Sequence, residues 1–266
     1  MRQFILEKQN VKNGLITLEG KDFKYLRQVL RVKVGDMLNV RFPDGILQNT
    51  TVAQIDEKSK KIIIQICAST EKSITRGVQA TEFNNKLPDI EYWLFQFIPK
   101  AVKLEQIVRQ ATECGVSVIV PIIGEYSEKN SVNALEGAKK ERLDRIIREA
   151  RQQSGSPVDT KILAPVSLED AVGRWKEFCS DSQNESVAFV LSERDDCNDN
   201  LRDVVNKTAS IKKVAIAVGS EGGISPDEVA FLQEKGLFYP IHFAVNILRC
   251  ETAALYGIAA VQSAIN

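Results

Sequence analysis

The sequence lacks most of what metal sites, disulfide frameworks and membrane spans require. Its five cysteines are scattered along 266 residues without a C-x-x-C pair, and it has a single histidine, so neither a disulfide framework nor a metal site is expected. No apolar run approaches the roughly 20 residues of a membrane-spanning helix. The start, Met1-Arg2-Gln3-Phe4, lacks the apolar core of a signal peptide. These absences predict a cytoplasmic protein with no membrane partner.

Net charge is also absent, because 35 basic side chains balance 35 acidic ones. The balance conceals an asymmetry. Residues 1–73 hold 13 Lys and Arg against 8 Asp and Glu, a net charge of +5, so the remainder carries −5. This difference indicates that residues 1–73 are better suited to face phosphate groups. A solvated charged surface explains the same count equally well.

Short β-rich runs separated by turn residues fill the first part of the chain. The runs lie at 15–18, 37–42, 49–55 and 61–66. Several short strands with regular turns predict a small β-barrel domain, here residues 1–73. A polar stretch at 70–88 predicts a linker, so the second domain is expected to cover residues 74–266.

One helix is predicted within this first domain, from Lys21 to about Val32. Its spacing places Lys24, Arg27 and Arg31 on one face, three and four residues apart. A basic helix face beside a small barrel predicts contact with an RNA backbone through these three side chains. The polar outer face of an ordinary helix is an equally good interpretation.

Strands alternate with helices from residue 90 onward, which is typical of a parallel sheet covered on both faces. We expect strands at 91–98, 116–123, 161–164, 187–191, 214–218 and 241–244, and helices at 103–114, 135–153, 167–178 and 252–265. The last helix is apolar nearly all round. It therefore belongs in the domain core or against another subunit.

A glycine loop at 219–223 (GSEGG) follows the strand predicted at 214–218. Ser225 is a good N-cap, Pro226 fits the first helical position and Glu228 completes a capping box, so a helix is expected to begin here. The loop lacks the Lys-Ser/Thr of a P-loop and the spacing of a dinucleotide motif. By itself it is consistent with a tight strand-to-helix turn that binds nothing.

The glycine loop becomes specific together with a second motif. GSEGGISPDE, followed about twenty residues later by NILRCETAALYGIAAV, resembles the RsmE family, SPOUT-class methyltransferases that use S-adenosylmethionine to modify N3 of a uridine in 16S rRNA. The resemblance continues through KLEQIVRQATECGV (103–116), EARQQS (149–154) and YLRQVLRVKVGD (25–36). It therefore covers nearly the whole chain.

Four positions depart from the usual residues of that family. They are Ser220 (often Pro), Cys250 (often Thr or Ala), Tyr25 (often His) and Ser156 (often Arg). No glycine of the loop is lost. A role for an imidazole at position 25, or for an arginine at position 156, does not carry over to this chain.

The resemblance implies a fold, a cofactor and partners. The implied fold is a PUA-like β-barrel followed by an α/β domain with a SPOUT-type parallel sheet, whose last part, about 187–266, forms a trefoil knot. It also implies a homodimer that acts on 16S rRNA of the small ribosomal subunit. The residues expected to bind S-adenosylmethionine are Leu191, Gly219, Ser220, Gly222, Gly223, Ile247, Leu248, Arg249 and Thr252.

Methylation of N3 of uracil requires the loss of a proton from that nitrogen. Glu221 is the first candidate for the proton acceptor and Glu251 the second, although Glu251 is equally well explained as a carboxylate at a helix N-terminus. Arg249 is expected to stabilise negative charge on the uracil carbonyl oxygens. His242 lies inside a predicted buried strand, so we expect a satisfied core residue there.

Two other functions compete with the N3 methyltransferase. One is another SPOUT enzyme that methylates tRNA or the ribose of rRNA. The other is a non-catalytic RNA-binding or assembly protein on the same fold. The intact glycines and Arg249 count against the second of these.

Overall fold

The computed structural model describes residues 3–7, 11–67, 88–135, 138–193, 200–208 and 210–265. The chain divides into two compact units, Met1–Leu87 with Arg151–Pro157, and Pro88–Ala150 with Val158–Asn266. The predicted domain boundary at 73/74, and all of the predicted linker except residue 88, fall outside the described residues. That boundary stays a prediction.

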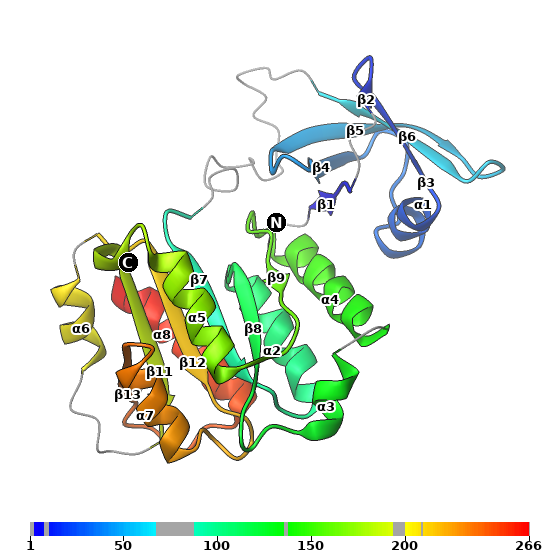
Figure 1. The fold of residues 1–266 in the computed structure, drawn as a ribbon. Helices are drawn as coiled ribbons and strands as arrows, with labels where there is room; N and C mark the ends of the chain where they lie inside the picture. Colours follow the sequence, from blue (N-terminus) through cyan, green and yellow to red (C-terminus); the bar gives the residue numbers. More distant parts are fainter. Residues whose placement is uncertain are drawn as a thin grey trace. The chain divides into compact units, whose positions relative to one another are not determined.

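The first unit is built on a β half-barrel, as the short β-rich runs predict (Figure 1). Six strands follow in the order β1-β4-β5-β6-β3-β2. Their bounds are β1 Phe4–Ile5, β2 Val11–Lys12, β3 Leu15–Glu19, β4 Met37–Arg41, β5 Leu47–Asp56 and β6 Lys61–Ile66. Alternate apolar side chains of these strands, such as Ile16, Val52 and Ile64, share one core. The prediction of a small β domain is confirmed.

The helix of this unit differs from the prediction. It consists of α1 (Lys21–Lys24) and a π-helical turn, η1 (Tyr25–Val29), and it ends there. The N–H of Leu30 reaches back five residues to the Tyr25 carbonyl at 3.1 Å. Arg31 has a φ of 53°, the left-handed conformation that ends many helices, here with arginine instead of glycine. The predicted start at Lys21 is confirmed, whereas the predicted end at about Val32 is wrong, because the helix ends at Val29.

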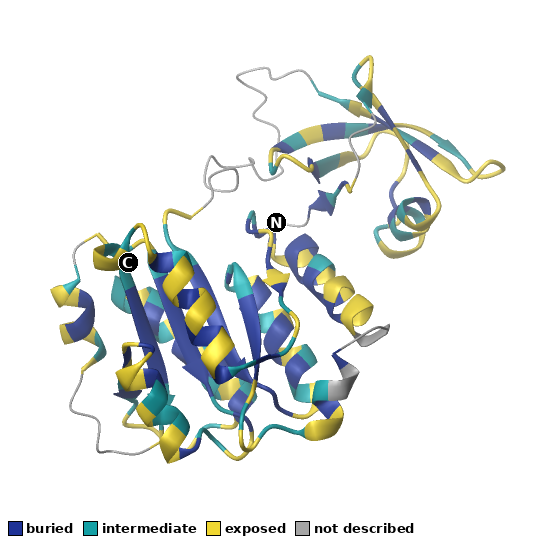
Figure 2. Cartoon of the chain, in the orientation of Figure 1, coloured by how far each residue is buried: buried dark blue, intermediate teal, exposed yellow. Residues whose placement is uncertain are grey.

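The second unit contains a parallel sheet in the order β10-β8-β7-β12-β11-β13, with β9 paired to β8 beside this path. The bounds are β7 Glu91–Phe97, β8 Val118–Ile123, β9 Lys161–Ile162, β10 Val166–Ser167, β11 Ser186–Ser192, β12 Lys213–Val218 and β13 Phe238–His242. The central strands are apolar on both sides and buried (Figure 2). The predicted parallel sheet is confirmed.

Helices cover both faces of this sheet, as the alternation of elements predicts. Their bounds are α2 Ala101–Glu113, α3 Lys129–Ala134, α4 Ala138–Ser154, α5 Leu168–Cys179, α6 Leu201–Lys207, α7 Pro226–Glu234 and α8 Cys250–Ile265, with a short 3₁₀ turn, η3, at Gln183–Glu185. One core packs the sheet against α2, α4, α6 and α8, and the other packs it against α5 and α7. No helix in the described part of the chain is long and apolar enough to cross a membrane.

The last strand begins earlier than predicted. The expected strand at 241–244 is β13, Phe238–His242, which includes Pro240. Because β13 lies at the edge of the sheet, a residue without an N–H is tolerated there. The chain leaves the sheet at Phe243, and residues 243–249 form the β13–α8 loop. The trefoil knot that the resemblance implies for 187–266 stays a prediction.

Candidate functional site

A cavity of about 550 Å³ lies at the carboxyl ends of β11, β12 and β13. Its walls come from these strand ends, from the glycine loop (residues 219–223), from α7 and from the β13–α8 loop. Ligands of parallel α/β sheets bind at this end of the strands. The volume is within the range of small-molecule sites.

The glycine loop is folded back on itself. The N–H of Gly223 donates to the Ser220 carbonyl at 3.1 Å, and a Cβ placed on Gly219 would lie 2.6 Å from the Gly223 carbonyl carbon. Gly223 has a φ of +80°. Both positions therefore require glycine, one for close backbone packing and the other for its backbone conformation.

The predicted helix after this loop is confirmed with its cap. The Ser225 hydroxyl accepts from the Glu228 N–H, and the Glu228 carboxylate accepts from the Ser225 N–H at 2.9 Å. Pro226 is the first residue of α7. This capping box fixes where the glycine loop ends, as the sequence motif predicts.

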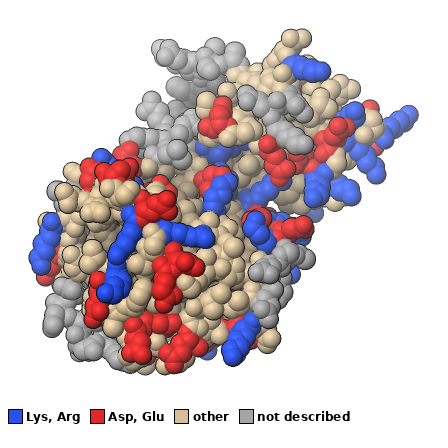
Figure 3. All heavy atoms as spheres, viewed as in Figure 1, with Lys and Arg blue, Asp and Glu red and all other residues tan. Residues whose placement is uncertain are grey.

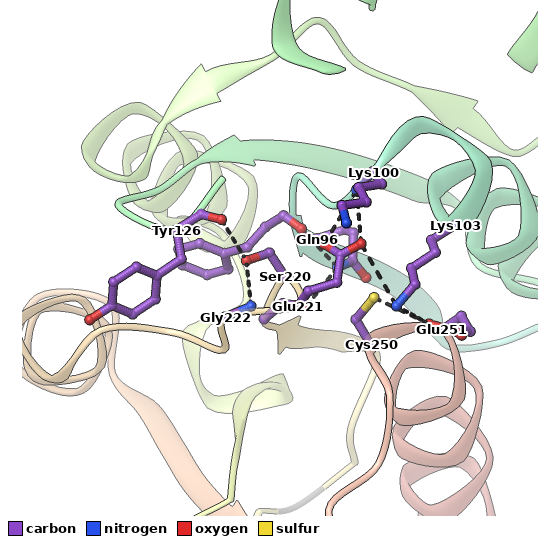
Figure 4. Close-up of polar contacts among 11 residues, drawn as sticks. Gln96, Lys100, Lys103, Tyr126, Ser220, Glu221, Gly222, Cys250 and Glu251 are labelled. Carbon is purple, nitrogen blue, oxygen red and sulfur yellow. Dashed lines mark hydrogen bonds and ion pairs between the residues drawn. The ribbon is translucent and has the colours of Figure 1, made fainter. Parts of the chain in front are cut away.

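Close packing against Tyr126 requires glycine at position 222, one of the residues expected to bind the cofactor. A Cβ at this position would lie 2.8 Å from the Tyr126 Cβ, and Gly222 does not line the cavity. The neighbouring Ser220 side chain is buried and donates to the Tyr126 carbonyl at 3.0 Å (Figure 4). The loop is thus attached to the segment around Tyr126, a contact that sequence reasoning missed.

Gln96 supports the glycine loop through hydrogen bonds. It is fully buried near the end of β7, and its amide donates to the carbonyls of Val218 at 3.3 Å and Gly219 at 3.0 Å. The sequence held a signal for this residue, because Gln96 is the polar residue in the otherwise apolar run YWLFQF. A buried amide in such a strand needs hydrogen-bond partners.

Lys103, in the first turn of α2, is a second residue that the sequence prediction missed. Its Nζ lies 3.2 Å from Glu251 Oε2 and 3.7 Å from Glu221 Oε1. Glu221 also accepts from the Lys100 N–H through both oxygens, at 3.2 and 3.3 Å. Burial would raise the pKa of Glu251, but its own backbone N–H and the Lys103 ammonium lower it overall.

The thiol of Cys250 is held in the same cluster. Burial raises the pKa of Cys250 to about 12, and its Sγ donates to Glu251 Oε2 at 3.4 Å. A thiol with such a pKa is protonated at neutral pH and is a poor nucleophile. Cys250, where threonine or alanine is usual, therefore acts here as a buried donor.

The β13–α8 loop presents apolar side chains at the cavity. Ile247 is 81% exposed and Val245 is 45% exposed, and both line it. Apolar side chains in the lining are typical of cavities that bind small molecules. The Arg249 carbonyl accepts from the N–H groups of Thr252 and Ala253 at 2.8 and 2.7 Å, which starts α8.

His242 lies elsewhere than expected. It is the last residue of β13, half-buried, and it lines the cavity instead of the core. Its Nδ1 is 3.2 Å from the Ser192 carbonyl oxygen at the end of the neighbouring strand. The prediction of a core residue is wrong because β13 ends at His242, where the chain leaves the sheet.

Most predicted cofactor-binding residues meet at this cavity. Those that line it are Leu191, Gly219, Ser220, Gly223, Ile247, Leu248 and Arg249. Gly222 and Thr252 do not line it. Of the residues predicted to be catalytic, Arg249 and Glu221 line the cavity, whereas Glu251 lies beside it against Lys103. The roles of all these residues stay predictions.

The predicted RNA-binding side chains do not share one helix face. Arg31 lies beyond the helix, and Arg27 pairs with Glu57, with Nη2 2.6 Å from Oε1. The Nη1 of Arg27 donates to the Val32 carbonyl at 2.6 Å. The π-helical turn changes the angular spacing on which the predicted face depended. In Figure 3, Lys and Arg side chains stand out along α1 and at the β5–β6 turn of this unit.

Within the described ranges, no cluster of three or more His, Cys, Asp or Glu side chains is placed to hold a metal ion. The cavity is lined by charged side chains, such as Arg249 and Glu193, and by apolar ones, such as Ile247 and Leu248. Such a mixed lining is suited to a ligand that carries both polar and apolar surface.

Residues 85–262 match the family model of the RNA methyltransferase domain, and residues 18–65 match that of the RNA methyltransferase PUA domain. The chain is 28% identical over 270 residues to a ribosomal RNA small subunit methyltransferase E 2 of Borreliella burgdorferi, covering 97% of this chain and 96% of the relative. It is 35% identical over 176 residues to a ribosomal RNA small subunit methyltransferase E of Aquifex aeolicus, covering 65% and 69%.

Two solved structures share the fold across nearly the whole chain. A ribosomal RNA small subunit methyltransferase E from Neisseria gonorrhoeae bound to S-adenosylmethionine has a TM-score of 0.74 at 21% identity, covering 99% of this chain and 97% of that one. A methyltransferase from Legionella pneumophila with the same cofactor has a TM-score of 0.73 at 21% identity, with the same coverage. At this identity, the likeness concerns the fold.

Proposed function

The chain belongs to the RNA methyltransferase family, and we propose that it transfers a methyl group from S-adenosylmethionine to N3 of a uridine in 16S rRNA of the small ribosomal subunit. The observation that carries the proposal is the cavity between the glycine loop and the β13–α8 loop. Full-length similarity to a relative named for small-subunit rRNA methylation supports the substrate class. We place the activity in the cytoplasm, where this rRNA is found.

The residues at the cavity fit the proposed cofactor. A side chain at Gly223 would meet nothing nearer than Glu193 Oε1 at 3.9 Å, so glycine leaves open space for a ligand beside the backbone. Ile247 and Val245 offer apolar surface to an adenine ring. The carboxylate of Glu193 lines the cavity and favours a cationic ligand.

S-adenosylmethionine supplies an electrophilic methyl group when it is bound. The glycine loop and the β13–α8 loop position that group and exclude water. Arg249 is proposed to stabilise the charge that develops on a uracil carbonyl oxygen when N3 loses its proton. Glu221 and Glu251 are both held by donors, and these contacts favour a structural role over proton transfer.

Transfer of labelled methyl groups to small-subunit rRNA tests this function directly. We expect 3-methyluridine as the labelled nucleoside. A ribose-methylated nucleoside would instead identify a SPOUT enzyme of another specificity. Normal RNA binding without S-adenosylmethionine binding, measured by calorimetry, would identify a non-catalytic assembly protein.

RNA binding is proposed for the first unit, and Arg27 offers an internal control. Lys24→Ala and Arg31→Ala should each weaken RNA binding and reduce the log–log salt slope by about one, because each removes a free positive charge near phosphate. Arg27→Ala should change the slope little, since the Arg27 guanidinium is engaged by Glu57 and the Val32 carbonyl and is not expected to contact phosphate. The measurement is RNA affinity between low and moderate salt. The affinity for S-adenosylmethionine should be unchanged in all three variants. Equal slopes for all variants and the wild type would exclude this surface.

A homodimer is proposed through α8. Its exposed side chains Thr252, Tyr256, Ala259 and Ser263 lie three or four residues apart and form one stripe of mostly small residues, which suits close helix packing. Ala259→Arg should therefore convert a dimer, seen by light scattering at micromolar concentration, into a monomer. Gly173→Arg, on the exposed face of α5 with open space around it, should leave the dimer intact. A wild-type protein that is monomeric and fully active would contradict the proposal.

A further inference from the structure

Lys103 joins three segments that are far apart in the sequence. It projects from the first turn of α2 toward one carboxylate in the glycine loop, Glu221, and one in the first turn of α8, Glu251 (Figure 4). The Lys100 N–H, at the N-cap of the same helix, binds Glu221 as well. The start of α2 therefore contacts both segments that border the cavity.

These ion pairs are shielded from solvent more than ordinary surface pairs. The side chains of Glu251, Lys103 and Glu221 are only 13%, 26% and 29% exposed. Burial would lower the pKa of Lys103, but its hydrogen bond to Glu251 and the negative charges of Glu251 and Glu221 raise it overall. These directions favour the charged forms of Lys103 and Glu251. The loss of the central ammonium would leave the carboxylates of Glu221 and Glu251 without their shared partner.

Each carboxylate belongs to a segment that shapes the cavity. Glu221 lies between Gly219 and Gly223, and Glu251 follows Arg249 by two residues. The glycine loop and the β13–α8 loop both line the cavity, and each is continuous with one carboxylate. A shift of either carboxylate would move a cavity wall.

We propose that Lys103 is a positioning residue that fixes the glycine loop and the start of α8 relative to each other, so that the two loops enclose the methyl donor in one geometry. This inference rests on the proposed function, because donor binding is its readout. Lys103 also lines the cavity, so a direct contact with the carboxylate of the donor is the competing role.

A lysine-to-methionine exchange separates these roles. Lys103→Met keeps a chain of similar length and removes the charge. We expect its affinity for S-adenosylmethionine to fall about tenfold or more, as for loss of a coupled supporting contact. Affinity for 5′-methylthioadenosine, which has no carboxylate, should fall by the same factor. A loss confined to S-adenosylmethionine would overturn the positioning role in favour of direct contact.

A double-mutant cycle tests the coupling itself. Once Glu251→Gln is present, Lys103→Met should cost much less affinity than in the wild type, because the pair is already broken. Additive losses would contradict the inference. Lys103→Arg should restore most of the affinity, and it provides a folded variant if Lys103→Met does not fold. Unchanged affinity in Lys103→Met, or no rescue by arginine, would also contradict it.

Glu105→Gln is the matched control in α2. Glu105 pairs with Arg142, whose side chain is 63% exposed, and Glu105 does not line the cavity. Its replacement should leave the affinity for both ligands unchanged. If the wild type binds neither S-adenosylmethionine nor 5′-methylthioadenosine, the proposed function fails. If it binds both and Lys103→Met does too with equal affinity, only the positioning role fails.

Discussion

Gly223→Val is expected to lower the affinity for S-adenosylmethionine by about 100-fold or more. Two costs combine at this position. The φ of +80° is strained for a β-branched residue, and the new side chain would occupy the open space in which the donor is proposed to lie. Gly219→Val should be as severe, since its Cβ would overlap the Gly223 backbone and force the loop open. Calorimetry on the folded variants measures both losses.

The effect of backbone strain can be separated from the effect of lost ligand space by a substitution at a second glycine, Gly45. Gly45 has a φ of +86° and open space around it, and it lies in the first unit. Gly45→Val should therefore lower the melting temperature through the same backbone strain while the donor still binds normally. A folded Gly223→Val protein with wild-type affinity would show that the donor binds elsewhere.

Arg249→Ala is expected to lower kcat by about 10²- to 10³-fold, the usual cost of removing one donor to a developing oxyanion. The affinity for S-adenosylmethionine should change only a few-fold. The reason is that the backbone carbonyl of residue 249, which starts α8, is kept in any variant. Single-turnover methylation at saturating donor separates these two effects.

Arg249→Lys is the informative companion variant. It keeps the positive charge but loses the planar set of donors, so we expect a kcat between those of the wild type and the alanine variant. If Arg249→Ala instead raised the dissociation constant for the donor by the same factor as it lowered kcat/KM, the side chain would serve binding, and its proposed catalytic role would be excluded.

Much of the fold follows from local sequence patterns. The apolar runs that became β7, β8, β11 and β12 are buried on both faces, and such runs are typical of central parallel strands. The start of α7 was predictable to the residue because Ser225 and Glu228 satisfy each other's backbone N–H groups. Both signals are local, so one sequence is enough to detect them.

The errors arise where non-local structure overrides such patterns. Taken alone, Pro240 indicates the end of a strand. It nevertheless lies inside β13, because a residue without an N–H is tolerated in an edge strand. The helical period placed Lys24, Arg27 and Arg31 on one face, but a π-helical turn and the left-handed Arg31 rearranged them. Neither the π-helical turn nor the left-handed conformation of Arg31 has a marker in the local sequence.

The candidate site was predicted only in part, because local sequence patterns do not reveal non-local contacts. The glycines and the loop before α8 were found from their motifs, which are contiguous. The support from Gln96, Lys103 and Tyr126 was missed, because each contacts the glycine loop from more than 90 residues away. Spacing along the chain carries no information about such contacts, even where a buried glutamine in an apolar strand hints at one.

The most direct test of the proposed activity is mass spectrometry of nucleosides from 16S rRNA of cells that lack the gene for this protein. We expect 3-methyluridine to be lost from that rRNA, to return when the wild-type gene is supplied, and to stay absent with Arg249→Ala. An unchanged level of 3-methyluridine in the deletion strain, or the loss of a ribose-methylated nucleoside in its place, would contradict methylation of uracil N3 by this enzyme.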